Sequence, residues 1–242
     1  MNSNAILEIR GFSKSYGTDK VAVDNLSLSV MGGDIFGFIG HNGAGKSTTI
    51  RAVVGVLDFT EGEITIDGHS VRNEPVACKR VTAYIPDNPD LYENLTGMQY
   101  LNFVADVFGI GAAEREERIR KYADMFEITS DLGDLIGAYS HGMKQKVAII
   151  SALIHDPKLL VLDEPFVGLD PKAAFTLKEI MRDMCGRGAA VFFSTHVLDV
   201  AEKLCNKVAI IKHGRIIASG TMEALTEGHS LEQVFLEADG NE

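Results

Sequence analysis

A glycine-rich segment carries the residue types and the spacing of a phosphate-binding loop. Gly40-His41-Asn42-Gly43-Ala44-Gly45-Lys46-Ser47 fits the pattern G-x-x-x-x-G-K-[ST], and Thr48 follows it directly. The glycines let successive backbone N–H groups converge on phosphate oxygens at the positive end of the next helix. Lys46 then reaches the outer phosphates, and the Ser47 hydroxyl can ligate Mg²⁺. A chance glycine-rich turn before Lys-Ser is the rare alternative, so the segment predicts a nucleotide-phosphate site.

Two adjacent carboxylates, Asp163 and Glu164, end an apolar run that starts at residue 159. A buried parallel strand delivers its last residues to the sheet edge where ligands bind. There, Asp163 can hold the Mg²⁺ shell and Glu164 can orient or deprotonate an attacking water. Taken alone, such a run is more often a plain strand end. Together with the phosphate loop it predicts phosphoryl chemistry.

Ser140 and Gly142 begin a second helix with features of an anion site. Ser140 alone could be an ordinary N-cap. Gly142 weakens the first helical turn, and close approach of an anion to the backbone would explain it. One nucleotide needs only one phosphate loop, so a second anion-binding helix end suggests a nucleotide held by another chain.

His196 and Tyr16 have less specific patterns. His196 follows an apolar run, 191–195, at the expected catalytic edge, but alone it would more often cap the next helix. Tyr16 beside Gly17 is either a turn aromatic or a stacking residue. The remaining histidines are interpreted as turn or surface residues: His69, His155, His213 and His229.

The elements that must position these residues are mainly strands and helices in alternation. Alternating patterns predict antiparallel strands at 6–12 and 21–30 around a turn at 16–19. Strand, loop and helix follow at 35–57, with further strands at 63–67 and 81–85. Alternation of strands and helices from residue 158 favours a mostly parallel sheet. The expected strands there are 159–163, 190–194, 208–211 and 215–218, and the expected helices are 171–185 and 197–204.

The stretch between the two halves of this pattern has helical periodicity at 96–108, 114–126 and 141–154. The fold class expected is therefore α/β: a P-loop core with a mainly parallel sheet, an N-terminal antiparallel β subdomain and an inserted helical subdomain. We expect one domain over 1–242, divided into a core of 1–90 and 157–226, a helical subdomain of 91–156 and a helical tail of 227–242.

Composition excludes several other classes of protein. The 242 residues are 45% hydrophobic and 24% charged, which is typical of a globular chain. A net charge of −11 with scattered Lys and Arg makes nucleic acid an unexpected partner. The three widely spaced cysteines indicate neither a disulfide framework nor a zinc site. Without a signal-like N-terminus or a membrane-length apolar run, the chain is expected in the cytoplasm.

The order of these motifs resembles the ATP-binding subunit of an ABC transporter over about residues 6–226. Segment 40–48 is similar to the Walker A loop, 139–143 to the family signature, 159–164 to the Walker B strand with its catalytic glutamate, and 168–170, which ends at Asp170, to the D-loop. The resemblance makes His196 the γ-phosphate contact and Tyr16 the aromatic that stacks on adenine. It implies ATP and Mg²⁺ as cofactors.

Two departures from the family pattern stand out. The signature keeps Ser140 and Gly142 but has Tyr139, His141 and Met143 where Leu-Ser-Gly-Gly-Gln is usual. Asp87 stands where a glutamine normally ends the strand before the helical region. A carboxylate can approach Mg²⁺ but cannot donate a hydrogen bond to water or to a partner chain.

The resemblance also implies partners. Two such chains, identical or different, would close head to tail around two Mg-ATP and drive a separate transmembrane permease subunit on the inner face of the cell membrane. The expected docking surface is 86–95, with Pro89, Leu91, Tyr92 and Leu95. The alternative is that these apolar residues only pack the helical subdomain. The short chain and its Tyr-Ser-x-Gly-Met signature resemble export-type subunits. The alternatives are a weakly hydrolytic, nucleotide-sensing subunit and a soluble ABC ATPase without a transport role.

Overall fold

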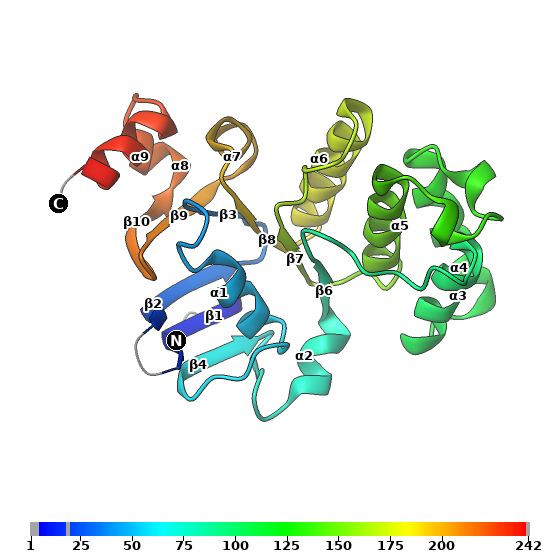
Figure 1. The fold of residues 1–242 in the computed structure, drawn as a ribbon, viewed down its shortest axis with the longest axis horizontal. Helices are drawn as coiled ribbons and strands as arrows, with labels where there is room; N and C mark the ends of the chain where they lie inside the picture. The colour runs from blue at the N-terminus through cyan, green and yellow to red at the C-terminus, as the bar shows by residue number, and fades with distance from the viewer. Residues whose placement is uncertain (1–4, 18–19, 241–242) are drawn as a thin grey trace.

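A six-stranded sheet forms the centre of the molecule, in the order β10-β9-β3-β8-β7-β6 (Figure 1). The computed structural model describes residues 5–17 and 20–240. Neighbouring strands are parallel except at the β10–β9 edge. The strands are β3 (Ile35–Ile39), β6 (Thr82–Ile85), β7 (Leu159–Asp163), β8 (Ala190–Thr195), β9 (Lys207–Lys212) and β10 (Arg215–Thr221). Every residue of β3, β7 and β8 is buried, as expected for apolar strands covered on both faces.

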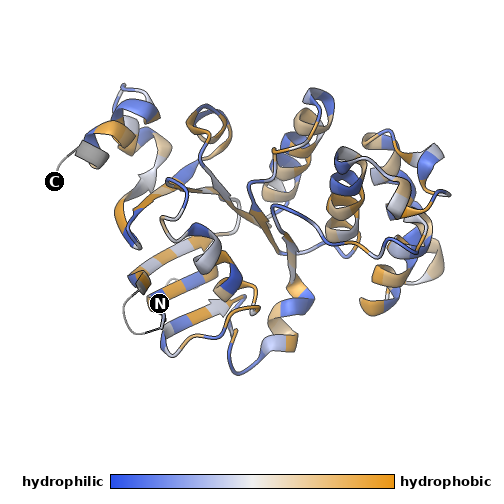
Figure 2. Ribbon diagram, viewed as in Figure 1, coloured by the Kyte–Doolittle hydropathy of each residue, from blue (hydrophilic) through white to orange (hydrophobic). Residues whose placement is uncertain are grey.

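A four-stranded antiparallel sheet, β2-β1-β4-β5, packs beside the central one. Its strands are β1 (Ala5–Tyr16), β2 (Lys20–Met31), β4 (Glu61–Ile66) and β5 (His69–Ser70). Hydrophobic and hydrophilic residues alternate along β1 and β2, as Figure 2 shows. The expected antiparallel opening is confirmed. Of the turn expected at 16–19, Thr18 and Asp19 lie outside the described residues.

The period of two along the central strands divides the core between the two faces of the sheet. Phe36 and Phe38 point to one face, where they join the antiparallel sheet and helix α1 (Lys46–Val53). Ile35 and Ile39 point to the other face and meet residues from the helical part of the chain. That face is covered by α6 (Pro171–Gly186) and α7 (Leu198–Leu204) and, at the C-terminal end, by α8 (Met222–Thr226) and α9 (Leu231–Gly240).

The middle of the chain is helical, as expected, and gathers at the end of the molecule opposite α8 and α9 (Figure 1). It contains α3 (Gly97–Val107), α4 (Ala112–Met125) and α5 (His141–Leu153), with short 3-10 turns η1 (Thr129–Asp131) and η2 (Ile136–Ala138). Thr96 and Gln99 form a reciprocal capping box that fixes the start of α3. Among the described residues, no helix is both long and apolar enough to cross a bilayer.

Two local expectations differ from the structure. The helix after the phosphate loop ends at Val53 rather than at residue 57, because Gly55 adopts φ 68° and closes a Schellman motif. In that motif the Val56 N–H donates to the Arg51 carbonyl and the Gly55 N–H to the Ala52 carbonyl. A further helix, α2 (Pro75–Val81), precedes β6 and was not expected from the sequence.

Candidate functional site

The loop between β3 and α1 has the conformation that its glycines predict. Gly45 adopts φ 113°, and a Cβ at this position would lie 2.7 Å from the Ala22 carbonyl oxygen. Gly40 is equally confined, because a Cβ there would lie 2.4 Å from the Ile211 carbonyl oxygen. A side chain at either position would therefore displace backbone of the neighbouring strands.

Lys46 is folded back onto the loop that it terminates. Its side chain is only 6% exposed, and Nζ donates to the carbonyl oxygens of Gly40 at 2.6 Å and His41 at 3.3 Å. Nζ also lies 3.7 Å from Oε1 of Glu164. The cation is thus held at the centre of the loop, with the carboxylate of the Walker B-like strand beside it.

A pocket of about 450 Å³ opens over this loop. It brings together most of the residues expected to bind nucleotide and metal. These are Tyr16, Asn42, Gly43, Gly45, Lys46, Ser47, Thr48, Asp87, Asp163 and Glu164. Ala44 is instead buried in the core, and Gly40 contributes the carbonyl that holds Lys46. Three further lining residues were missed from the sequence: Val21, Ala22 and His213.

The carboxylates Asp163 and Glu164 have different environments. Asp163 is almost fully buried and accepts a hydrogen bond of 2.5 Å from the Ser194 hydroxyl, which fixes its orientation. Glu164 has φ 50°, an uncommon backbone conformation for a glutamate, and its N–H donates to Ser194 Oγ at 3.1 Å. Oε1 of Glu164 lies 3.0 Å from Nδ1 of His196. His196 therefore contacts the site through Glu164.

Oxygen atoms suited to Mg²⁺ converge on the same pocket. Ser47, Asp87 and Asp163 all line it, whereas no group of three or more His, Cys, Asp or Glu side chains among the described residues forms a ready metal cage. Mg²⁺ usually takes one or two carboxylates and completes its shell with phosphate and water. The donor set therefore fits Mg²⁺ bound together with a nucleotide.

The predicted signature residues, Ser140 and Gly142, lie outside this pocket. Ser140 caps α5, since its Oγ accepts from the Met143 N–H at 3.3 Å. A Cβ on Gly142 would lie 3.2 Å from the Gly168 carbonyl oxygen, so packing against the 167–170 turn gives a second reason for this glycine.

Asp170 also lies outside the pocket and joins two helices. It caps α6 by accepting from the Ala173 N–H at 2.8 Å, and it pairs with Lys146 of α5 at 2.9 Å. The bond from Ala173 and then that from Lys146 lower the pKa of the Asp170 carboxyl. The turn that follows Glu164 is thereby fixed to the helix that begins at Ser140.

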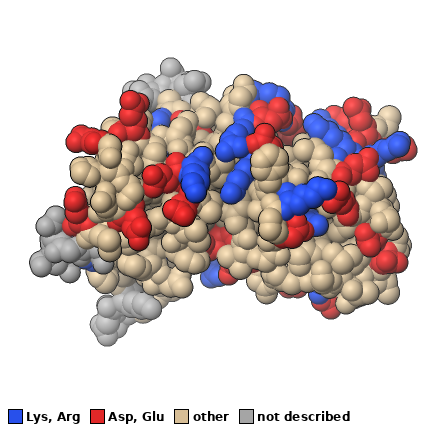
Figure 3. Space-filling model, turned by 90° about the horizontal axis from the view of Figure 1, so that it is seen from above, with Lys and Arg blue, Asp and Glu red and all other residues tan. Residues whose placement is uncertain are grey.

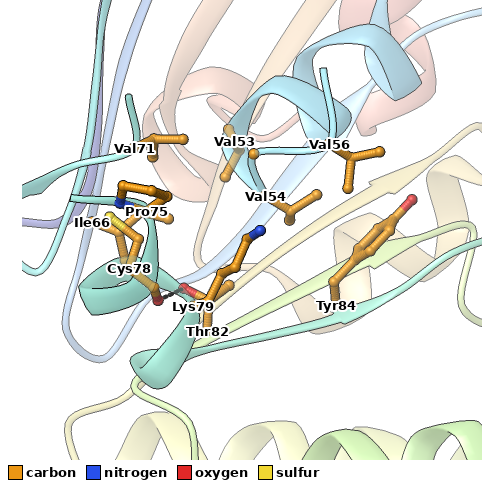
Figure 4. Close-up of a pocket in the computed structure, with 11 residues that line it drawn as sticks. Val53, Val54, Val56, Ile66, Val71, Pro75, Cys78, Lys79, Thr82 and Tyr84 are labelled. Atoms are coloured by element: carbon orange, nitrogen blue, oxygen red, sulfur yellow. Dashed lines mark hydrogen bonds between the residues drawn. The ribbon is translucent and has the colours of Figure 1, made fainter. Parts of the chain in front are cut away.

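A separate apolar cavity of about 100 Å³ lies between the end of α1, helix α2 and strand β6 (Figure 4). Val53, Val54, Ile66 and Cys78 line it, and Tyr84 forms one wall. Burial and then the negative charge of Asp163 raise the pKa of the Tyr84 hydroxyl. Tyr84 therefore lies close enough to the nucleotide pocket to interact electrostatically with Asp163. The cavity and the pocket nevertheless share no lining residue.

Two of the histidines expected in turns or at the surface make further contacts. His155 stacks face to face on Phe108, with ring centroids 3.8 Å apart, and burial lowers its pKa to about 4. His155 occupies the turn after α5, as expected, but its ring is partly buried against Phe108. His213 does occupy a turn, between β9 and β10, with φ 46°, but its side chain also lines the pocket.

The positive charge that attracts an anion to the site comes from nearby groups and not from the net charge of the protein. On the face drawn in Figure 3, Lys and Arg side chains lie among Asp and Glu side chains, and the chain carries −11 overall. An anionic ligand must therefore be attracted by the loop N–H groups and Lys46, because the field of the whole protein opposes it.

The fold and this pocket define a P-loop nucleotide-binding protein, and the comparisons give its family. The chain belongs to the ABC transporter family, whose pattern it matches over residues 23–167. It is an ATP-binding subunit and an ATPase of that family.

The similar proteins cover nearly the whole chain. The chain is 36% identical over 233 residues to the ABC-type transporter ATP-binding protein EcsA of Bacillus subtilis (strain 168). The matched region covers 96% of this chain and 94% of the relative. The chain is also 34% identical to the Nod factor export ATP-binding protein I of Rhizobium sp. (strain N33), over 99% of this chain and 78% of that one. A solved structure of an ATP-binding subunit of an ABC transporter superposes with a TM-score of 0.92 at 36% identity, over 97% and 99% of the two chains.

Proposed function

We propose that two copies of this chain close head to tail around two Mg-ATP, and that this closure drives a separate membrane permease in export. The observation that carries the proposal is the separation of two anion-binding features. Lys46 and the glycine loop line the pocket, whereas the capped start of α5 at Ser140 and Gly142 does not. A helix N-terminus that serves no phosphate of its own chain is suited to the phosphate of a partner.

Within each pocket, the chain's own residues bind and orient the nucleotide. Tyr16 stacks on the base, and the loop N–H groups with Lys46 hold the phosphates. Lys46 exchanges its loop carbonyl partners for phosphate oxygens, so the loop is already shaped around a positive charge before ligand enters. Ser47, Asp163 and Asp87 would hold Mg²⁺, which would supply positive charge against the negative charge that develops on the phosphate oxygens.

Hydrolysis depends on Glu164. Its carboxylate orients and deprotonates the attacking water, and His196, 3.0 Å from Oε1, fixes that carboxylate and contacts the γ-phosphate. Ser140 and Gly142 of the partner complete the site. Asp170 acts at the same interface by holding the 167–170 turn against α5.

The proposed permease surface is narrower than the segment 86–95 expected from the sequence. Pro89 and Leu91 are buried, so their assignment to an exposed surface was wrong. Tyr92 is 59% exposed and packs edge to face with Phe103, at 5.7 Å between ring centroids. This aromatic pair is suited to hold an apolar segment of a membrane subunit at the inner face of the membrane.

The direction of transport is proposed from a relative. The Rhizobium relative, similar over 99% of this chain, is named for Nod factor export. This similarity supports export.

The decisive test uses Glu164→Gln protein in static light scattering, with and without Mg-ATP. Loss of hydrolysis should trap the closed state, and the mass should double only with Mg-ATP. The control is the double variant Glu164→Gln/Lys46→Ala, which should stay monomeric because it cannot hold the phosphates. A Glu164→Gln protein that binds ATP and remains monomeric would contradict the homodimer.

The permease surface has its own test. Tyr92→Glu should leave the ATPase activity of the isolated chain unchanged and abolish its co-purification with membranes. Ile217→Glu, at another exposed apolar residue, is the matched control and should still co-purify. Co-purification that survives Tyr92→Glu would exclude this surface.

A further inference from the structure

The C-terminal helix α9 contacts the phosphate-binding loop directly. The ring of Phe235 packs edge to face against the imidazole of His41, with centroids 4.9 Å apart and planes at 73°. His41 occupies the second position of the glycine loop. A helix near the end of the chain therefore reaches the segment that must cradle the phosphates.

Several other contacts hold helix α9 in place. Leu231 is fully buried and Phe235 is 8% exposed, and both belong to the core cluster on the α7 side of the central sheet. Ser230 and Gln233 form reciprocal side-chain bonds to each other's N–H groups at the helix start. The Leu231 N–H also donates to Glu202 of α7 at 3.1 Å. The Phe235 side chain is consequently held in one position by the packing of α9.

His41 is well placed to transmit that support to the loop. Its carbonyl oxygen accepts from the Ala44 N–H at 3.1 Å and from Lys46 Nζ at 3.3 Å. The next residue, Asn42, lines the nucleotide pocket. Restricting the His41 ring restricts the backbone that carries this carbonyl, and preorganised binding loops bind more tightly because less order is lost on binding.

We propose that Phe235 is a positioning residue for nucleotide binding, acting through His41 to hold the phosphate loop in its binding conformation. The C-terminal helix thereby sets the affinity for the nucleoside triphosphate. The proposal requires only that the chain binds nucleotide; it is independent of the dimer, the permease and the direction of transport.

The test is the dissociation constant for a fluorescent ATP analogue, measured on isolated protein. Phe235→Leu keeps α9 apolar and packed but removes the ring, and should weaken binding roughly 2- to 10-fold, the range expected for loss of an aromatic pair. Phe235→Tyr should bind like the wild type. The matched control is Leu236→Ala, at a neighbouring residue of α9 that is 62% exposed, and it should have no effect.

A double-mutant cycle separates positioning from general packing. In a His41→Ala background, Phe235→Leu should cause no further loss of affinity, because the contact is already absent. Equal losses in both backgrounds, or wild-type affinity in Phe235→Leu, would overturn the proposal. Since His41 is exposed, His41→Ala should retain the fold, and thermal unfolding checks this for each variant.

Discussion

The imidazole of His196 faces the carboxylate of Glu164, with Nδ1 3.0 Å from Oε1. This contact joins the residue after β8 to the residue after β7, two neighbouring parallel strands whose ends meet at one sheet edge. Positioned acid and base groups typically contribute about 10²- to 10⁴-fold to rate. His196→Ala should therefore lower the ATP turnover number by at least about 10²-fold.

Nucleotide affinity should fall much less than turnover in His196→Ala, because the phosphate loop and Lys46 are untouched and only one γ-phosphate contact is lost. Steady-state hydrolysis and fluorescent-nucleotide binding, measured on the same preparation, separate the two effects. Val197→Ala is the matched control at the neighbouring exposed position. A His196→Ala protein with normal turnover would remove this residue from the mechanism.

Asp87 should affect the requirement for metal. It lines the pocket together with Ser47 and Asp163, and replacing it with Asn removes a negative oxygen ligand. Asp87→Asn should raise the Mg²⁺ concentration for half-maximal ATPase activity several-fold, measured by titration of MgCl₂ at fixed ATP. Asp90→Asn, at an exposed carboxylate three residues away, should leave the titration unchanged. Identical curves for all three proteins would refute a metal role for Asp87.

Tyr16 should contribute to recognition of the base and not of the phosphates. Its side chain is exposed at the edge of the pocket, where the ring can stack on a base, and Lys14 Nζ lies 5.6 Å from the ring centroid. Tyr16→Ala should weaken ATP binding roughly 2- to 10-fold. Competition by inorganic triphosphate should be unaffected, and Tyr16→Phe should retain ATP affinity. If Tyr16→Ala lowers the affinities for triphosphate and for ATP equally, Tyr16 positions the phosphate loop and does not bind the base.

Asp170 should stabilise the fold in a pH-dependent way. Asp170→Ala removes the N-cap of α6 and a half-exposed ion pair, and should lower the free energy of unfolding by about 1 kcal/mol at pH 7, mostly from the cap. The folded-state pKa of Asp170 lies below its ordinary value of 3.8. The stabilisation by ionised Asp170 is therefore fully present above pH 3.8. It is lost as the pH falls through the lower pKa of the folded state.

Urea unfolding of the wild type and Asp170→Ala at several pH values tests this linkage. The difference between the two proteins should shrink below about pH 4, where the carboxyl becomes protonated. Asp170→Asn keeps a capping oxygen and should lose less stability at pH 7. A difference that is constant down to pH 3 would contradict an ionised role for Asp170.

Local patterns were sufficient where a residue's role follows from its immediate neighbours. The strand Leu159–Asp163 has the bounds expected from its apolar run, and the carboxylate after it lies at the predicted edge. The phosphate loop likewise follows from glycines that tolerate positive φ or close backbone. In contrast, α2 is only seven residues long, and its one signal is Pro75 at the first helical position after Glu74.

Contacts between distant segments were the part that local patterns could not supply. The pairing of β4 with β1 and the approach of His213 to the nucleotide pocket both depend on how remote strands meet. Leu91 had the apolar character of a docking residue, but packing against the helical part buries it. Hydrophobic residues at a junction satisfy a core and an interface equally well, so only the packed structure separates the two.

The 167–170 turn has a consequence for the kinetics of ATP hydrolysis in the proposed dimer. The Glu164 carbonyl accepts from the Val167 N–H, Gly168 lies against the start of α5, and Asp170 is paired with Lys146. In the proposed dimer, only a few contacts would thus separate Glu164 of one chain from the helix end that faces the nucleotide of the other chain. Occupancy of one site should bias the geometry of the other, and the ATP dependence of turnover should be sigmoidal, with a Hill coefficient above one.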